Sequence, residues 1–128
     1  MAAVGESHRL SDKTVLLVDD QVDFLDVVQR SLELDGYDVV TAQDATQALQ
    51  RLEAARPVCI IVDHRLVGAS GTDLVRLVRE RHGTGMVIVM CTAHVDPAHT
   101  DAAERAGVDL VLPKPIDFDK LRTVLPPS

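Results

Sequence analysis

With 128 residues, 46% of them hydrophobic, the chain is long enough for one globular domain with a substantial core and too short for two. Its 13 basic and 20 acidic side chains give a formal charge of −7, which argues against direct binding of nucleic acid by this domain. Aromatic residues make up only 2% of the chain, so the core must be aliphatic, and stacking platforms for bases are absent.

The sequence contains no membrane or export signal. The first residues, MAAVGESHRLSDK, have no apolar run long enough for a signal peptide, and no later segment reaches the ~18 apolar residues of a membrane span. We therefore expect a cytoplasmic protein without a membrane partner.

Cysteine and histidine give no sign of a metal site. Cys59 and Cys91 lie in apolar runs without CxxC spacing, which favours reduced core residues over a disulfide or a metal pair. The histidines share no metal-ligand spacing on one helix face. We expect each of them to be solvated separately: His8, His64, His82, His94 and His99.

Five short runs of aliphatic and β-branched residues predict β-strands. In chain order they are Val15–Val18, Val39–Ala42, Val58–Val62, Met86–Cys91 and Leu110–Leu112.

Segments of helical periodicity follow each of these runs. Capping residues and helix breakers mark their ends: Gly36, Asp44, Pro57, Ser70 or Thr72, Gly83, Asp96-Pro97, Gly107 and Asp117. The last helix is predicted to run from near Asp117 to Leu125, about nine residues or roughly 14 Å at 1.5 Å per residue.

Strand and helix alternate five times, which predicts an α/β fold: a doubly wound parallel sheet with helices on both faces. In such sheets ligands bind beyond the carboxyl ends of the strands. The polar residues that follow the predicted strands are therefore expected at one edge, and they are Asp19, Asp20, Asp63, Thr92 and Lys114.

Two adjacent carboxylates in TVLLVDDQ need an explanation, because like charges leaving a buried strand repel each other. A helix N-cap would explain Asp20 and leave Asp19 without a role. Together with Asp63 they carry three negative charges, and Lys114 returns one positive charge. A divalent cation that prefers oxygen ligands, such as Mg²⁺, would bring the sum to zero.

A sparse Mg²⁺ site suits phosphoryl transfer, since Mg²⁺ keeps several waters and commonly binds phosphate oxygens. The sequence has no GxxxxGK[ST] loop to hold a nucleotide, so the donor must be a small molecule or another protein. Asp63 is the candidate acceptor, because a carboxylate can form an acyl phosphate. Lys114 would neutralise phosphoryl oxygens, and the Thr92 hydroxyl would hydrogen-bond to one of them.

At these residues the sequence resembles the receiver domains of bacterial response regulators, the partners of histidine kinases in two-component signalling. The resemblance runs from about Lys13 to Leu125 and is carried by four motifs in order: VDD, VDHRLVGASG with Asp63 and Gly71, CTA with Thr92, and LPKP with Lys114. It implies a receiver domain over residues 13–125, after a flexible segment 1–12 and before a tail or linker start at 126–128.

The resemblance also implies a mechanism and partners. The sheet would be flavodoxin-like with strand order 2-1-3-4-5, and a histidine kinase or phosphotransfer protein would give its phosphoryl group to Asp63. Asp20 and Asp63 would hold Mg²⁺, Asp19 through water, with a further ligand from the Arg65 backbone carbonyl. Lys114-Pro115 would be a cis peptide. An output domain or partner protein would read the face of the fourth helix, fifth strand and fifth helix.

Two positions depart from the family's pattern. Val67 stands where the family usually has proline four residues after the phosphoacceptor, which predicts a more mobile loop. Val111 stands where the family usually has an aromatic residue that fills the space vacated by the threonine on activation. Valine is too small for that, and the fourth helix has an apolar stripe of alanines only. We therefore expect this helix itself to shift or fray.

Two other functions stay open. A Mg²⁺-dependent hydrolase working through an aspartyl-phosphate is one, although DDQVD does not fit the DxDx[TV] motif of such enzymes. A degenerate receiver acting only as a binding module is the other, although it would have no use for three uncompensated carboxylates.

Overall fold

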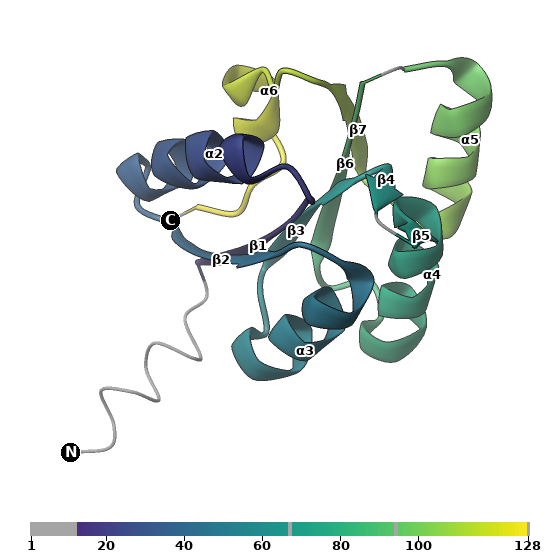
Figure 1. The fold of residues 1–128 in the computed structure, drawn as a ribbon, viewed down its shortest axis with the longest axis horizontal. Coiled ribbons are helices and arrows are strands. Elements are labelled where there is room, and N and C mark those ends of the chain that lie inside the picture. The colour runs from purple at the N-terminus through teal and green to yellow at the C-terminus, as the bar shows by residue number, and fades with distance from the viewer. Residues whose placement is uncertain (1–12, 67, 94, 128) are drawn as a thin grey trace.

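The computed structural model describes residues 13–66, 68–93 and 95–127. Its centre is a five-stranded parallel sheet of order β2-β1-β3-β6-β7 (Figure 1). The strands are β1 (Thr14–Val18), β2 (Asp38–Ala42), β3 (Cys59–Asp63), β6 (Val87–Thr92) and β7 (Leu110–Pro113). Counted among themselves these strands follow the order 2-1-3-4-5, so the predicted doubly wound fold is confirmed. The predicted flexible segment 1–12, Val67 and His94 lie outside the described residues.

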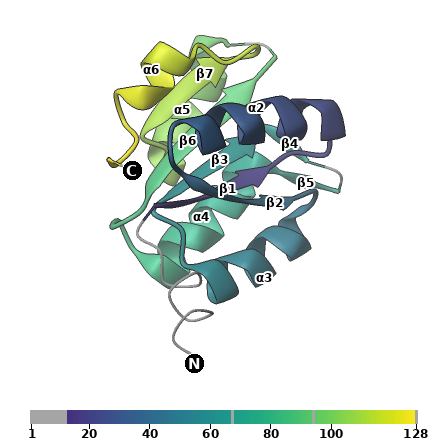
Figure 2. The same ribbon diagram turned by 90° about the vertical axis from the view of Figure 1, so that its left-hand side faces the viewer.

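Helices cover both faces of this sheet, as Figures 1 and 2 show. They are α2 (Val22–Leu34), α3 (Ala45–Ala55), α4 (Gly71–His82), α5 (Pro97–Ala106) and α6 (Phe118–Arg122). The core cluster on one face contains side chains of α2 and α6, and the cluster on the other contains side chains of α3, α4 and α5. The alternating strand residues divide between these two clusters, so the sheet is buried on both sides.

Capping residues set the helix boundaries much as predicted. The side chains of Asp44, Ser70 and Asp96 each accept a hydrogen bond from the backbone N–H three residues further on, which satisfies a free donor of the first turn. Gly107 ends α5 with a φ of 114°, a conformation that favours glycine. Cys59 and Cys91 are buried free cysteines, as expected.

Two local predictions were wrong or incomplete. The last helix ends at Arg122. Beyond it the Thr123 hydroxyl donates to the Lys120 carbonyl at 2.6 Å, and the Thr123 and Val124 N–H groups donate to carbonyls three residues back instead of four. Between β3 and α4 the chain also forms a short hairpin of β4 (Arg65–Leu66) and β5 (Ala69–Ser70), which the sequence pattern did not indicate.

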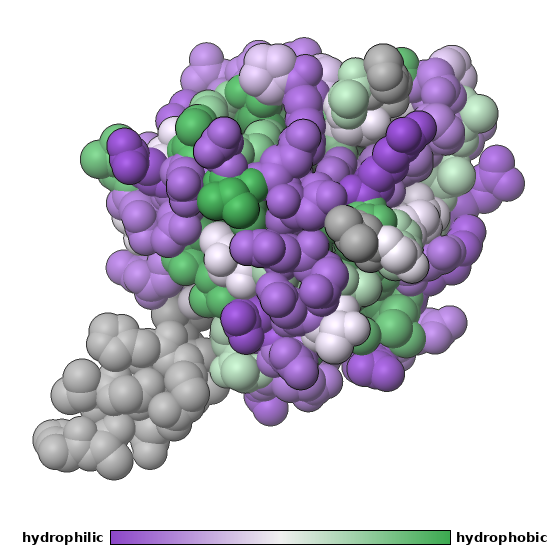
Figure 3. Space-filling view, in the orientation of Figure 1, coloured by the Kyte–Doolittle hydropathy of each residue, from purple (hydrophilic) through white to green (hydrophobic). Residues whose placement is uncertain are grey.

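The face of the domain seen in Figure 3 is mainly polar. Figure 3 shows one face coloured largely as hydrophilic residues, with hydrophobic ones in small separate patches. Among the described residues, no helix combines the length and the apolar character that crossing a membrane requires.

Gly71 is expected to be intolerant of a side chain. A Cβ at this position would lie 2.2 Å from the backbone carbonyl oxygen of Asp63. Because this oxygen belongs to the backbone, it cannot move away as the end of a flexible side chain could. Gly71→Ala should therefore lower the free energy of unfolding by about 1–3 kcal/mol, measured by urea denaturation.

Gly85→Ala is the matched control, because a Cβ there would meet nothing within 4 Å. It should change stability by no more than about 0.5 kcal/mol. Equal stability of the two variants would show that the close approach at Gly71 is not needed.

Candidate functional site

The carboxyl ends of β1, β3, β6 and β7 surround a cavity of about 310 Å³. Four of the five predicted edge residues line it, and the fifth, Asp19, lies buried beneath. The lining residues are Asp20, Gln21, Asp63, His64, Arg65, Thr92, Ala93, His99 and Lys114. The prediction that the polar strand-end residues gather at one edge is thus confirmed by the geometry.

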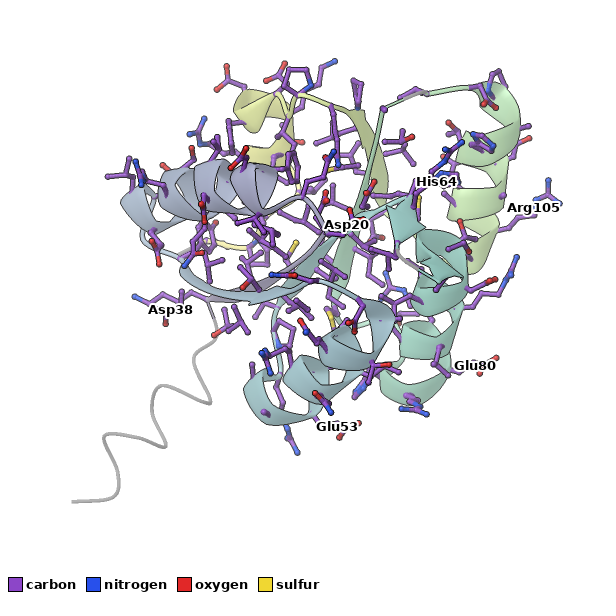
Figure 4. All side chains as sticks on the ribbon, viewed as in Figure 1. Asp20, Asp38, Glu53, His64, Glu80 and Arg105 are labelled. Carbon is purple, nitrogen blue, oxygen red and sulfur yellow. The ribbon has the colours of Figure 1, made fainter. Side chains whose placement is uncertain are left out.

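Three carboxylates meet at this cavity. One oxygen from each of Asp19, Asp20 and Asp63 lies within 4.8 Å of the other two. Asp19 is fully buried, Asp63 is partly buried and Asp20 is exposed, at the end of β1 in Figure 4. This cluster is the group among the described residues whose spacing would suit a metal ion.

Asp19 and Asp20 have different roles in the fold. The Asp19 carboxylate accepts a hydrogen bond from the Gln21 backbone N–H at 2.9 Å and one from Lys114 Nζ at 2.6 Å. Asp20 is not the N-cap of α2, because Gln21 takes that position and makes no side-chain cap bond. The alternative reading of Asp20 as an N-cap was therefore wrong, and the Asp19 carboxylate instead accepts from the N–H of the N-cap residue Gln21.

Lys114 supplies the single ammonium group of the cluster. Its Nζ lies 2.6 Å from Asp19 Oδ2, 3.5 Å from Asp63 Oδ2 and 4.3 Å from the centre of the Phe24 ring. Burial lowers the pKa of Lys114, but the hydrogen bond and charge of Asp19 and the charge of Asp63 raise it by more. The Lys114-Pro115 peptide is cis, as predicted. Lys114 is therefore held in its charged form between the two carboxylates.

Asp63 is the carboxylate whose ionisation is opposed. Burial raises its pKa, the charge of Asp19 raises it further, and Lys114 with the Arg65 backbone N–H only partly offsets this. One ammonium does not balance three carboxylates. An added cation would favour the ionised form of Asp63, which is the form that can act as a nucleophile.

Backbone hydrogen bonds fix the strand ends around Asp63. The His64 N–H donates to the Cys91 carbonyl and the Lys114 N–H to the Thr92 carbonyl, each at 2.9 Å. Thr92 is only 6% exposed and ends β6, so its side chain belongs to the floor of the cavity. Arg65 lies in β4 and lines the cavity; a metal-ligand role of its backbone carbonyl stays a prediction.

Two histidines meet at the cavity, a contact that the sequence pattern does not indicate. The rings of His64 and His99 lie 4.6 Å apart between centroids, with an angle of 37° between their planes. His99 Nδ1 is 2.8 Å from Asp96 Oδ2. Burial and then the charges of His99 and Arg65 lower the pKa of His64. For these two histidines the expectation of separate solvation was wrong, and no local sequence signal joins residues 35 positions apart (99 minus 64).

Comparison with known proteins agrees with this architecture. The RegA protein of Cereibacter sphaeroides, a regulator of the photosynthetic apparatus, is 31% identical over 90% of this chain, which spans 62% of RegA. The CheY4 chemotaxis response regulator of Vibrio cholerae has a solved structure with a TM-score of 0.83 and 29% identity, covering 90% of this chain and all of CheY4 (100%).

A response regulator of Burkholderia pseudomallei, solved with a phosphorylated aspartic acid and a calcium ion, matches with a TM-score of 0.83 and 29% identity over 90% of this chain and 67% of that one. The family model of the response regulator receiver domain matches residues 15–126. This match covers nearly the whole described fold, so the chain belongs to the receiver domains of two-component response regulators.

Proposed function

We propose that this receiver domain accepts a phosphoryl group on Asp63 from the phosphohistidine of a histidine kinase or phosphotransfer protein, in a Mg²⁺-dependent reaction. The observation that carries the proposal is the placement of Asp63 in an open cavity beside two further carboxylates and the Lys114 ammonium. The aspartyl-phosphate in the related Burkholderia pseudomallei structure supports an acyl phosphate as the product.

The residues at the cavity fit a Mg²⁺ ion, since three carboxylate oxygens within 4.8 Å are the hard donors that this ion prefers. Asp20 and Asp63 would bind it directly. Asp19 would act through water, because its oxygens already accept from Gln21 and Lys114. The Arg65 carbonyl would be a further ligand. Bound Mg²⁺ would neutralise charge on the phosphoryl oxygens as they approach the carboxylates.

The chain's own residues would divide the work of the transfer. An Asp63 oxygen forms a bond to phosphorus while the phosphorus–nitrogen bond of the donor breaks, and the electron pair leaves with the histidine nitrogen. The Lys114 ammonium, held 3.5 Å from Asp63, would neutralise a phosphoryl oxygen. The Thr92 hydroxyl would donate a hydrogen bond to another phosphoryl oxygen.

The output of the domain is proposed by the same reasoning. Phosphorylation would change the surface formed by α5, β7 and α6, where an output domain or partner protein would bind. RegA is a regulatory protein of which this chain spans 62%, which supports an output separate from the receiver domain in that protein.

Asp63→Asn should abolish labelling by acetyl phosphate in the presence of Mg²⁺, followed as a mass increase of the intact protein. Chelating the Mg²⁺ should abolish it as well. The matched control is Asp38→Asn, an exposed aspartate at the start of β2, which Figure 4 shows far from Asp20. It should label like the wild type.

The same experiment separates the other two functions. Labelling of Asp63→Asn at wild-type stoichiometry would overturn the assignment of the acceptor. Steady phosphate release from unrelated phosphate esters would point to a hydrolase, and absence of any labelling would point to a binding module.

The pH dependence of stability gives a second test, made without divalent cations. Because the folded-state pKa of Asp63 is raised above its ordinary value of 3.8, the folded protein holds this proton more tightly than the unfolded chain. Stability therefore falls as the pH rises from 3.8 through the folded-state pKa, and stays reduced above it. Asp63→Asn should thus be more stable than the wild type at pH 7.

The difference in the free energy of unfolding between Asp63→Asn and the wild type, measured by urea denaturation, should shrink as the pH falls towards 3.8. Adding Mg²⁺ at pH 7 should stabilise the wild type more than the variant. A variant that is no more stable than the wild type at pH 7 would contradict the unbalanced charge at Asp63.

A further inference from the structure

Helix α5 reaches the phosphoacceptor cavity through one side chain. Among the residues that line the cavity, His99 is the one that α5 contributes. It lies in the first turn of the helix and is about half exposed. Its ring contacts the ring of His64, the residue that follows the acceptor Asp63 in the sequence. Figure 4 shows His64 in the space between β4 and α5. The two imidazoles therefore connect the acceptor loop to the amino-terminal turn of α5.

The two ends of α5 are held very differently. At its carboxyl end, the mostly buried Arg79 of α4 donates to the Gly107 carbonyl through Nε at 3.0 Å and through Nη2 at 2.8 Å. The same guanidinium donates to the Met86 carbonyl and pairs with Asp109. Arg79 therefore ties the carboxyl end of α5 to α4 and to the residues that directly precede β6 and β7.

Helix α5 buries little apolar surface along its length. Its buried residues are Ala103 and Ala106, and each methyl group contributes far less apolar burial than a leucine or isoleucine would. An element with little buried apolar surface has low local stability. A change at the amino-terminal turn can therefore move this helix about its anchored end.

His99 lines the cavity, and its imidazole has a second nitrogen with which to bind a ligand there. Its Nδ1 lies 2.8 Å from Asp96 Oδ2, and Asp96 caps the helix by accepting a hydrogen bond from the His99 backbone N–H. This leaves Nε2 as the nitrogen for a further partner. A phosphoryl group on Asp63 would bring anionic oxygens into the cavity that both residues line. The His99 side chain would then lie between two anionic groups, the phosphoryl group and the Asp96 carboxylate.

We propose that His99 is the residue through which α5 detects phosphorylation, by a hydrogen bond from Nε2 to an oxygen of the phosphoryl group on Asp63. This inference rests on the proposed function, since it requires a phosphoryl group at that site. The contact pulls the amino-terminal turn of α5 towards β3 and changes its packing on His64. It takes the place of an aromatic read-out on β7, where the half-buried Val111 packs into the core instead.

The test uses beryllium fluoride with Mg²⁺ as the phosphoryl mimic, on the full chain. His99→Phe keeps a ring against His64 without nitrogen atoms, and His99→Gln keeps a hydrogen-bonding group. His82→Ala removes a histidine that lines a different cavity, between α3 and α4, and is the matched control. Amide NMR gives the affinity for the mimic, and amide hydrogen exchange gives the protection of Pro97–Ala106.

We expect His99→Phe to weaken binding of the mimic about fivefold, as the loss of one hydrogen bond of roughly 1 kcal/mol would. It should also lose the change in α5 protection that the mimic causes in the wild type. His99→Gln should restore part of both effects, and His82→Ala should behave as the wild type. If the ring had only a structural role, His99→Phe, which keeps a ring, would not be weaker than His99→Gln, which does not.

Three outcomes would overturn the inference. They are wild-type behaviour of His99→Phe in both measurements, failure of His99→Gln to recover more than His99→Phe, and no change of α5 protection in the wild type. Labelling the same proteins with acetyl phosphate distinguishes a failure of this inference from a failure of the proposed function. If wild-type Asp63 is not labelled, the proposed function fails; if it is labelled and α5 does not respond through His99, this inference alone fails.

Discussion

The ion pair between Lys114 and Asp19 is the contact on which the site depends. It joins the end of β7 to the end of β1, and β3 and β6 lie between these two strands in the sheet. The side chains are 15% and 1% exposed, so neither charge is well solvated without the other. Removing one partner of a buried pair typically costs ~3–5 kcal/mol, because the remaining charge is left uncompensated. The pair therefore fixes the strand ends around the Asp63 carboxylate.

The same pair leaves the site short of positive charge. Lys114 is shared between Asp19 and Asp63, while Asp20 faces the cavity without a described ammonium or guanidinium within salt-bridge distance. A core chosen for stability alone would not collect three carboxylates at one edge. In the proposed function, a divalent cation would offset the negative charge of the carboxylates and of the incoming phosphoryl group. The charge imbalance of the free site would then be relieved when both are bound.

The fold and the acidic cluster could be predicted because their signals are local or follow from topology. Buried runs placed the strands, single capping residues such as Asp44 and Asp96 placed the helices, and the parallel sheet brought the strand-end residues together. The hairpin of β4 and β5 was missed because two-residue strands carry no periodicity. The His64–His99 contact was missed because it depends on how α5 lies against the loop after β3, which no residue pattern specifies.

The packing of α5 explains how a small change at the cavity could have a large effect on this helix. Burying a leucine in place of an alanine adds roughly 2 kcal/mol of apolar stabilisation, so a leucine-lined helix such as α2 resists displacement. With only Ala103 and Ala106 buried, α5 has little of that resistance away from its anchor at Arg79. A difference of about 1.4 kcal/mol between two positions of the helix changes their ratio tenfold. The hydrogen bond proposed for His99, roughly 1 kcal/mol, would change this ratio about fivefold, so we infer that the amino-terminal end of α5 is where phosphorylation would be converted into movement.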